Sequence, residues 1–230
     1  MKKIVRAFAR LVTASQAAPG DGEHFCAGLD LKEHHDKERG AVDFLRVCQS
    51  WHRAFDKIEH GGIPVIACLQ GAVVGGGLEL ASAAHIRVAD SSTFFALPEG
   101  TRGIFTGGGA TVRTAKIISP NRMIELMLTG RVLDAVEGER LGLAHYVCNN
   151  EANPKTAYEL SLELAQRIAG NAILSNYAIV SSISRIADMS ATDGLFAEGL
   201  MAAVVQTGRD VQERLGEFVN KKAHKVKPTK

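Results

Sequence analysis

The chain has 230 residues, of which 46% are apolar and 23% charged, and its formal net charge is +2. This length suits one large domain with a substantial core, with or without a small appendage. So small a net charge gives no sign of a nucleic-acid or acidic-membrane partner, and no apolar run approaches the roughly 18 residues that a membrane span needs.

The N-terminal segment is basic and amphipathic. Arg6 and Arg10 interrupt what would be the apolar region of a signal peptide, which argues against secretion. Because no acidic residue comes before Asp21, a mitochondrial presequence stays open as an alternative to a plain surface helix.

The first half of the chain alternates strand and helix patterns after a turn-rich break at residues 18–24. A charged stretch over residues 32–39 is interpreted as a solvated loop or a helix start. Apolar residues at three- and four-residue spacing then predict an amphipathic helix, ended by the turn at residues 61–64. The expected elements are the amphipathic helix at 43–58, strands at 65–69, 86–89 and 93–97, and a buried helix at 78–84.

The second half is predicted to be helical, with a frayed Lys-rich end at residues 221–230. The expected helices cover 122–128, 135–141, 155–169, 172–187, 192–206 and 210–219. We interpret the whole as an α/β core over residues 1–170 with a C-terminal helical region over 171–230, an extension that often packs between subunits.

The cysteines give no sign of a metal site. Cys26, Cys48, Cys68 and Cys148 form no Cys-x-x-Cys pair, and no His lies at a zinc-ligand spacing from them. We therefore expect buried free thiols, which fit a reducing, cytoplasm-like compartment.

Three glycines precede the predicted buried helix, in Gly75-Gly-Gly-Leu-Glu79. They let the backbone approach a ligand closely, and unpaired N–H groups at a helix start can hold an anion or a developing oxyanion. Glu79 lies one turn into this helix, where a buried carboxylate needs partners or a task. A tight packing turn with a capping Glu is the alternative for this segment.

A second carboxylate, Glu99, follows a predicted strand and begins a glycine-rich loop that runs to Gly109. Two carboxylates can divide acid and base work if burial raises the pKa of one of them. The segment Phe25-Cys-Ala-Gly-Leu-Asp-Leu31 could offer another backbone N–H group, although a strand ending in a turn is the default interpretation.

These segments, in this order, resemble the crotonase superfamily, also called the enoyl-CoA hydratase/isomerase family. The resemblance covers roughly residues 22–222. The matching motifs are Phe25-Cys-Ala-Gly-Leu-Asp-Leu, Pro64-Val-Ile-Ala, Gly75-Gly-Gly-Leu-Glu-Leu-Ala, Phe95-Ala-Leu-Pro-Glu-Gly-Thr-Arg-Gly and Leu128-Thr-Gly-Arg. It implies a crotonase-like ββα spiral core with a C-terminal helical trimerisation region, and a homotrimer or a hexamer made of two trimers.

The resemblance also implies a substrate and roles for residues. The substrate would be an acyl-CoA thioester, with coenzyme A as part of the substrate and no permanently bound cofactor. The N–H groups of Leu29 and Gly76 would form the oxyanion hole, and Glu79 and Glu99 would be the catalytic pair. The coenzyme A contacts would come from Ala27, Gly28, Leu29, Asp30, Leu31, Gly76 and Lys221.

The leading hypothesis is an enoyl-CoA hydratase-type lyase in the cytoplasm, or in the mitochondrial matrix of a eukaryote. Because both glutamates are present, water addition is favoured over the reactions of members that lack one of them. The alternatives are another reaction of the family, such as double-bond isomerisation or hydroxyacyl-CoA cleavage, and a non-catalytic or RNA-binding module. A basic stripe for RNA is expected only in the tail, where lysines cluster from Lys221 to Lys230.

Four features depart from the family pattern. Few residues precede the Phe25 segment, and residues 1–20 do not resemble the usual strands, so we expect shortened N-terminal strands. His85 replaces a usual Asp and is expected either to bond within the core or to touch the pocket. Thr106 replaces a usual Pro, and Arg102 could shape the acyl pocket, pair with a substrate carboxylate or form a surface salt bridge.

Overall fold

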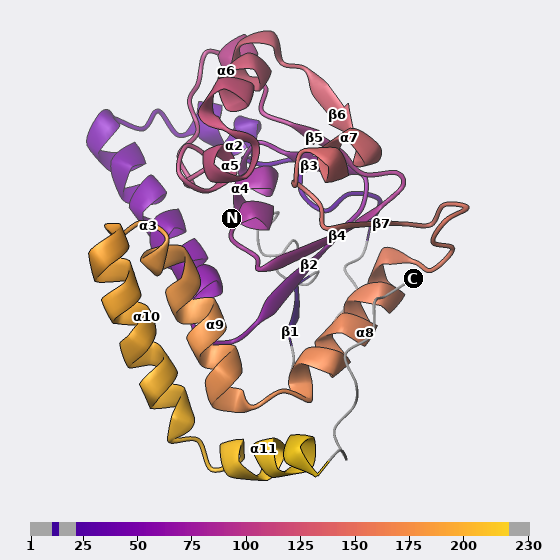
Figure 1. Ribbon diagram of the computed structural model, residues 1–230. Helices are drawn as coiled ribbons and strands as arrows, with labels where there is room; N and C mark the ends of the chain where they lie inside the picture. Colours follow the sequence, from indigo (N-terminus) through magenta and orange to yellow (C-terminus); the bar gives the residue numbers. More distant parts are fainter. Residues whose placement is uncertain (1–10, 14–21, 221–230) are drawn as a thin grey trace.

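The structure is a computed structural model that describes residues 11–13 and 22–220. Its strands form two sheets (Figure 1). The first has the order β1-β2-β4-β7, with β1 Leu11–Thr13, β2 Val65–Leu69, β4 Ile86–Asp90 and β7 Tyr146–Cys148. The second has the order β3-β5-β6, with β3 Ala72–Val74, β5 Phe94–Ala96 and β6 Val132–Asp134.

Helices cover both faces of the first sheet. Those before residue 141 are α2 Leu31–Asp36, α3 Ala41–His60, α4 Gly76–Ser82, the short 3-10 helix η1 Gly100–Arg102, α5 Arg113–Ile118, α6 Pro120–Thr129 and α7 Ala135–Arg140. Those after it are α8 Ala157–Ala169, α9 Ile173–Ile186, α10 Ala191–Gln206 and α11 Val211–Val219.

Strand β2 organises the core because all five of its residues are buried. Ile66 and Cys68 pack with α8 in one apolar cluster, whereas Ala67 and Leu69 join the larger cluster on the opposite face. This alternation follows from the period of two along a strand. Strand β2 pairs in parallel with β4, with Ile66 opposite Ile86, and α4 lies between these two strands in the chain.

Most predicted elements are confirmed, and the fold class is α/β as expected. The predicted buried strand coincides with β2, and the predicted amphipathic helix is α3, which ends at Gly61. One prediction was wrong: the second half, expected to be helical, also contains β6 and β7. Strands β1 and β3 were not predicted either, although β1, which pairs antiparallel with β2, has only three residues, as expected of shortened N-terminal strands. These four strands have three residues each, too few to display a period of two.

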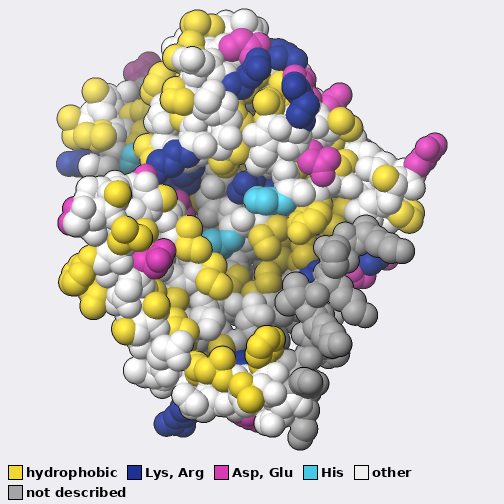
Figure 2. Space-filling model, viewed as in Figure 1, with side chains coloured by type: hydrophobic (Ala, Val, Ile, Leu, Met, Phe, Trp, Pro, Cys, Tyr) yellow, Lys and Arg dark blue, Asp and Glu magenta, His cyan; other side chains and the backbone are white. Residues whose placement is uncertain are grey.

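The helices after residue 172 extend away from the sheets (Figure 1). Helix α10 packs mainly on α9 and leaves large apolar side chains exposed, among them Phe196 at 70% and Leu200 at 55%. Figure 2 shows hydrophobic side chains on the outer surface of this region. The division at residue 170 and the oligomer stay predictions. Among the described residues, no helix has the length and apolar character to cross a membrane.

Candidate active site

The turn between β3 and α4 is built on Gly75. Its φ of 54° lies in the left-handed region, which favours glycine, and a Cβ placed there would lie 3.0 Å from Glu99 Oε1, a tight contact. The N–H group of Gly75 donates to the Ala96 carbonyl at 3.0 Å, which ties the turn to β5. Helix α4 begins at Gly76, and the Gly75 carbonyl accepts from the Leu78 and Glu79 N–H groups at 2.9 and 3.0 Å. The N–H groups at the very start of the helix, those of Gly76 and Gly77, have no such acceptor within it.

A parallel bridge brings the Phe25 segment beside this turn. Cys26 pairs with Val73, and its carbonyl accepts from the Val74 N–H at 3.0 Å. A Cβ built on Gly28, which has a φ of 92°, would lie 3.1 Å from the Gly76 nitrogen, and one built on Gly76 would lie 3.7 Å from the Leu29 nitrogen. The backbones that carry the Leu29 and Gly76 nitrogens therefore lie side by side, with no side chain between them.

Glu79 is almost completely buried in the first turn of α4. Its Oε1 accepts hydrogen bonds from the Gly108 N–H at 2.7 Å and from the Ala110 N–H at 3.2 Å. Burial raises the pKa of this carboxyl, and the backbone donors at Ala110 and Gly108 oppose the rise because they favour the ionised form. The glycine-rich loop thus holds one oxygen of Glu79 and fixes the direction of the carboxylate.

Glu99 is also buried, at 5% exposure, and among the described residues its Oε2 has no hydrogen-bond partner. Burial raises its pKa to about 7, and the nearby charge of Glu79 adds to the rise. The two glutamates therefore differ: Glu79 is anchored by two N–H donors, and Glu99 can carry a proton near neutral pH.

Both glutamates line one cavity of about 500 Å³. Its other lining residues are Leu29, His34, Arg39, Ala41, Phe44, Trp51, Gly76 and Ile104 to Gly107. A second cavity of about 50 Å³ shares Leu29, Gly76 and Glu99 with it and adds Ala27 and Leu31. The structure therefore brings together the four residues expected to carry the chemistry, with part of the expected coenzyme A segment beside them.

The other residues singled out in the sequence lie in varied places. Asp30 caps α2, where its Oδ1 accepts from the Glu33 N–H at 3.2 Å. Arg102 is exposed and lines the smaller cavity. Thr106 lines the larger one, and its buried Oγ1 has no partner among the described residues. Lys221 lies outside the described residues.

His85 bonds within the core, which was one of its two expected roles. Its Nδ1 accepts from the Val65 N–H at 3.0 Å, and its Nε2 lies 3.0 Å from the Glu59 carbonyl, to which it donates. These two bonds require the neutral ring, and burial correspondingly lowers the pKa of His85. The ring joins the end of α3 to the start of β2, and it does not line the cavity of the two glutamates.

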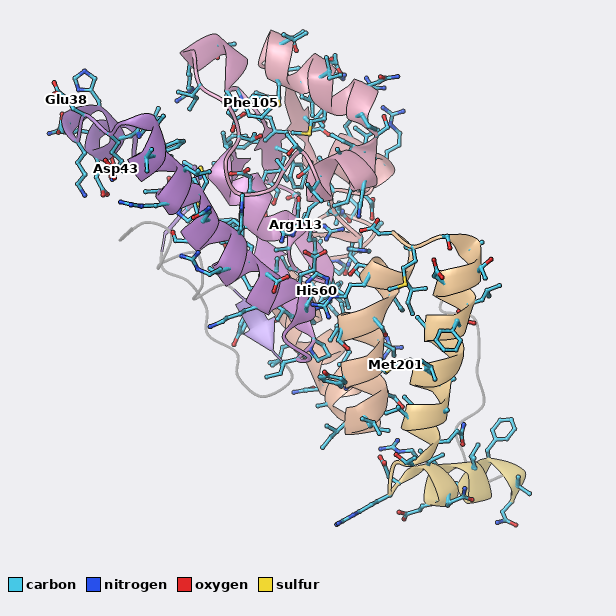
Figure 3. All side chains as sticks on the ribbon, turned by 90° about the vertical axis from the view of Figure 1, so that its left-hand side faces the viewer. Glu38, Asp43, His60, Phe105, Arg113 and Met201 are labelled. Atoms are coloured by element: carbon cyan, nitrogen blue, oxygen red, sulfur yellow. The ribbon has the colours of Figure 1, made fainter. Side chains whose placement is uncertain are left out.

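Sequence reasoning missed Arg113, which supports the loop that holds Glu79. Its Nη1 donates to the Gly108 carbonyl at 3.2 Å, and its Nε lies 2.5 Å from Glu59 Oε2 on α3. Figure 3 shows Arg113 beside the end of α3, near His60. No local signal could have found it, because its ionic partner lies 54 positions away.

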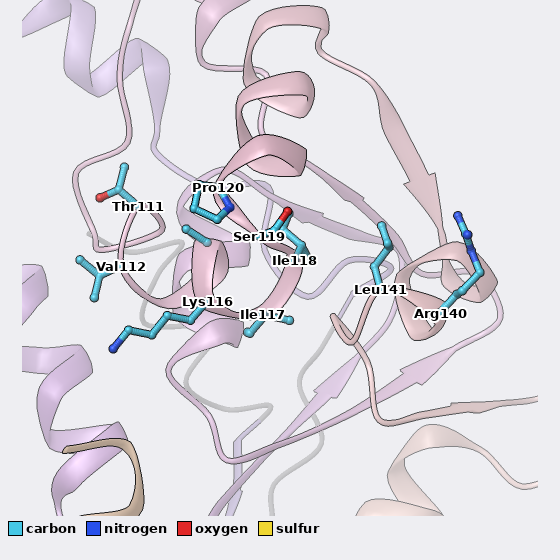
Figure 4. Close-up of a pocket in the computed structure, with 10 residues that line it drawn as sticks. Thr111, Val112, Lys116, Ile117, Ile118, Ser119, Pro120, Arg140 and Leu141 are labelled. Carbon is cyan, nitrogen blue, oxygen red and sulfur yellow. The ribbon is translucent and has the colours of Figure 1, made fainter. Parts of the chain in front are cut away.

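A larger cavity, of about 840 Å³, lies along α5 and the end of α7 (Figure 4). Its walls include Val112, Lys116, Ile117, Pro120 and Arg140, and neither of the two buried glutamates lines it. Size therefore does not identify the reactive site, whereas the paired buried carboxylates do.

Comparisons with known proteins give likenesses over most of the chain. Residues 18–227 match the family model described as enoyl-CoA hydratase/isomerase. The chain is 34% identical to "Enoyl-CoA isomerase/hydratase fer4" of Mycosarcoma maydis, covering 88% of this chain and 72% of that protein. It is 33% identical to the human mitochondrial "Enoyl-CoA hydratase domain-containing protein 2", covering 87% and 68%.

Solved structures show the same fold. A protein of Rhodopseudomonas palustris, provisionally named an enoyl-CoA hydratase, is 49% identical with a TM-score of 0.82, covering 88% of this chain and 76% of that one. An enoyl-CoA hydratase of Bacillus anthracis is 30% identical with a TM-score of 0.80, covering 91% and 79%. The family match over residues 18–227 includes the segments that carry the two glutamates.

Proposed function

The chain belongs to the enoyl-CoA hydratase/isomerase family, and we propose that it adds water to the α,β double bond of an acyl-CoA thioester. The observation that carries the proposal is a pair of buried carboxylates on one cavity, beside two adjacent main-chain N–H groups. One carboxylate accepts two main-chain hydrogen bonds, and the other has an oxygen without a partner among the described residues. Acyl-CoA is the proposed substrate, with no permanently bound cofactor, and a cytoplasmic or mitochondrial-matrix location stays a prediction.

The N–H groups of Leu29 and Gly76 are proposed to receive the thioester carbonyl oxygen. Donors that are already in place stabilise the negative charge that develops on this oxygen when a nucleophile adds to the conjugated double bond. Ala27, Gly28 and Leu31, with Asp30 at the start of α2, would lie along the coenzyme A arm, because Ala27 and Leu31 line the smaller cavity. Lys221 would contact the phosphates.

The two glutamates then divide the proton transfers. Glu79, held by two N–H donors that favour its ionised form, takes a proton from water, whose oxygen bonds to Cβ. Glu99, with a pKa raised to about 7 by burial, gives its proton to Cα as the enolate collapses. One water is consumed, and proton exchange with solvent returns both groups to their starting states.

The test follows loss of the conjugated thioester absorbance of crotonyl-CoA and of longer and aromatic enoyl-CoAs. Glu79→Gln and Glu99→Gln should each lower turnover by at least 100-fold, on the order of one acid–base group. Glu151→Gln, at an exposed position, is the matched control and should keep full activity. No turnover by wild-type protein would sink the proposal, and turnover that survives both substitutions would sink the roles.

Isomerisation is the second candidate, because a relative bears both names and two carboxylates can also move a proton between carbons. Incubating the protein with a 3-enoyl-CoA separates the reactions. Conversion to the 2-enoyl-CoA without any hydrated product would favour the isomerase.

A further inference from the structure

The cavity of about 500 Å³ that both glutamates line extends along α3 toward the N-terminal end of this helix. Near the glutamates, a Cβ on Gly108 would lie 2.9 Å from Phe55 and one on Gly107 would lie 3.5 Å from Trp51. Phe44, which also lines the cavity, lies seven positions before Trp51, roughly 10 Å along the helix axis. Figure 3 shows this helix lengthwise, from Asp43 near its start to His60 at its end.

The cavity wall along α3 is aromatic. Phe44 and Trp51 meet edge to face with ring centroids 6.3 Å apart, and His34 lies against Phe44 with centroids 5.0 Å apart. Such a wall suits a methylene chain that leads away from the thioester, because it removes apolar surface from water without offering hydrogen bonds.

Beyond Phe44 the wall changes to a guanidinium group. Arg39 lines the cavity, and its side chain is 17% exposed. Its Nη1 lies 3.4 Å from His34 Nδ1. Its Nη2 lies 3.6 Å from Glu33 Oε1, whereas that same oxygen is 2.7 Å from Lys37 Nζ.

Arg39 is therefore weakly paired for a mostly buried charge. A guanidinium carries five N–H donors. Among the described residues, only the His34 ring offers the Arg39 guanidinium a partner within 3.5 Å. A buried charge is costly unless it is paired, and the group that best pairs with this fork is a carboxylate that accepts two parallel hydrogen bonds.

We propose, on the basis of the proposed function, that the acyl group of the substrate ends in a second carboxylate, which binds Arg39 beside His34. The substrate class is then a linear enoyl-CoA with a distal carboxylate. Arg102, the other candidate for such a role, lines the smaller cavity next to Ala27, on the coenzyme A side of the thioester position. Its place suits the coenzyme A arm and not the far end of the acyl chain.

The first arm of the test compares kcat/KM for 2-hexenedioyl-CoA, 2-octenedioyl-CoA and 2-decenedioyl-CoA with the monocarboxylic enoyl-CoA of each length. For at least one of these lengths, the kcat/KM of wild-type protein should be roughly 10- to 100-fold higher for the thioester with a distal carboxylate, which is the effect expected of one charge-assisted pair. Arg39→Gln should bring the ratio of the two kcat/KM values to about one, and Arg39→Lys should keep part of the preference. Arg46→Gln, an exposed arginine on α3, is the matched control.

A second arm measures binding of octanedioyl-CoA and octanoyl-CoA by calorimetry, which needs no turnover. Tighter binding of octanedioyl-CoA that disappears in Arg39→Gln would support the proposal even if hydration failed. Equal binding and equal kcat/KM in wild-type protein would overturn it, as would a preference that Arg39→Gln leaves intact. Turnover of monocarboxylic enoyl-CoAs together with equal binding would leave the proposed function standing and refute this inference.

Discussion

Glu99→Gln is expected to stabilise the fold at alkaline pH while it removes activity. The pKa of Glu99 rises from 4.5 to about 7, first because of burial and then because of the charge on Glu79. A carboxyl whose pKa is higher in the folded than in the unfolded state binds its proton more tightly when folded. Its contribution to stability is therefore complete below pH 4.5 and is lost as the pH rises through 7.

The magnitude follows from that window. Each pH unit between the unfolded and folded pKa values is worth about 1.4 kcal/mol, so ionising buried Glu99 lowers the free energy of unfolding by about 3 kcal/mol. Glutamine has nearly the same shape and no charge, and therefore avoids this loss. We expect the variant to match wild-type protein near pH 5 and to be more stable by about 3 kcal/mol near pH 8.5.

Urea unfolding at the two pH values measures the difference, with all proteins at one concentration because association also changes apparent stability. Glu151→Gln, an exposed position, is the matched control and should follow wild-type protein at both pH values. A Glu99→Gln variant that is no more stable than wild type at the higher pH would refute the reasoning. An equal gain at both pH values would show that the cause is packing and not ionisation.

Three further predictions concern the support of the site. Arg113→Gln should lower kcat about 10- to 100-fold with little change in KM, because the substitution removes the hydrogen bond to the Gly108 carbonyl in the loop that holds Glu79. Steady-state kinetics checks this, with Lys116→Gln, which removes an exposed ion pair, as the control. An equal loss of kcat in both variants would contradict the prediction. Gly108→Ala would place a Cβ 2.8 Å from Glu79 Oε2, so it should lower the free energy of unfolding by about 1–3 kcal/mol and reduce activity. Urea unfolding and turnover measure the two effects. A variant with full activity and unchanged stability would show that this close packing is wrong. Burial lowers the pKa of His85, so this residue contributes stability that is present above its ordinary pKa of 6.5 and is lost as the pH falls. On acidification, the free energy of unfolding of wild-type protein should therefore fall more steeply than that of His85→Gln. Urea unfolding over this pH range measures both, and parallel dependences on pH would count against the prediction.

The sequence predicted those elements whose pattern is long enough to be distinctive. The apolar run at β2 and the spacing along α3 each extend over enough residues to display a period or a continuous buried stretch. Strands β1, β3, β6 and β7 were missed because a three-residue strand is defined by its pairing partners. Those partners lie far away in the sequence, so tertiary pairing determines what local preference does not.

The candidate site divides in the same way. Glu79 and Glu99 stand out because each carboxylate adjoins glycines in a predicted buried region. The contacts that distinguish the two glutamates cannot be found in the local sequence. The donors to Glu79 come from the loop at Gly108 and Ala110, and the pairing of Arg113 with Glu59 joins α5 to α3. Residue type and local pattern indicated which groups form the candidate site, but only the folded chain gives their burial and their hydrogen-bond partners.

The two N–H groups at Leu29 and Gly76 belong to the main chain, and this has a consequence for how the protein can diverge. A point mutation can replace a glutamate and change its chemistry in one step, but it cannot delete a backbone donor unless it introduces proline. Gly28 and Gly75, with left-handed φ values of 92° and 54°, are the positions through which mutation could misplace the donors. Carboxylates can therefore be exchanged over generations while the backbone that we propose to bind the carbonyl persists, so new reactions would arise on an inherited mode of thioester recognition.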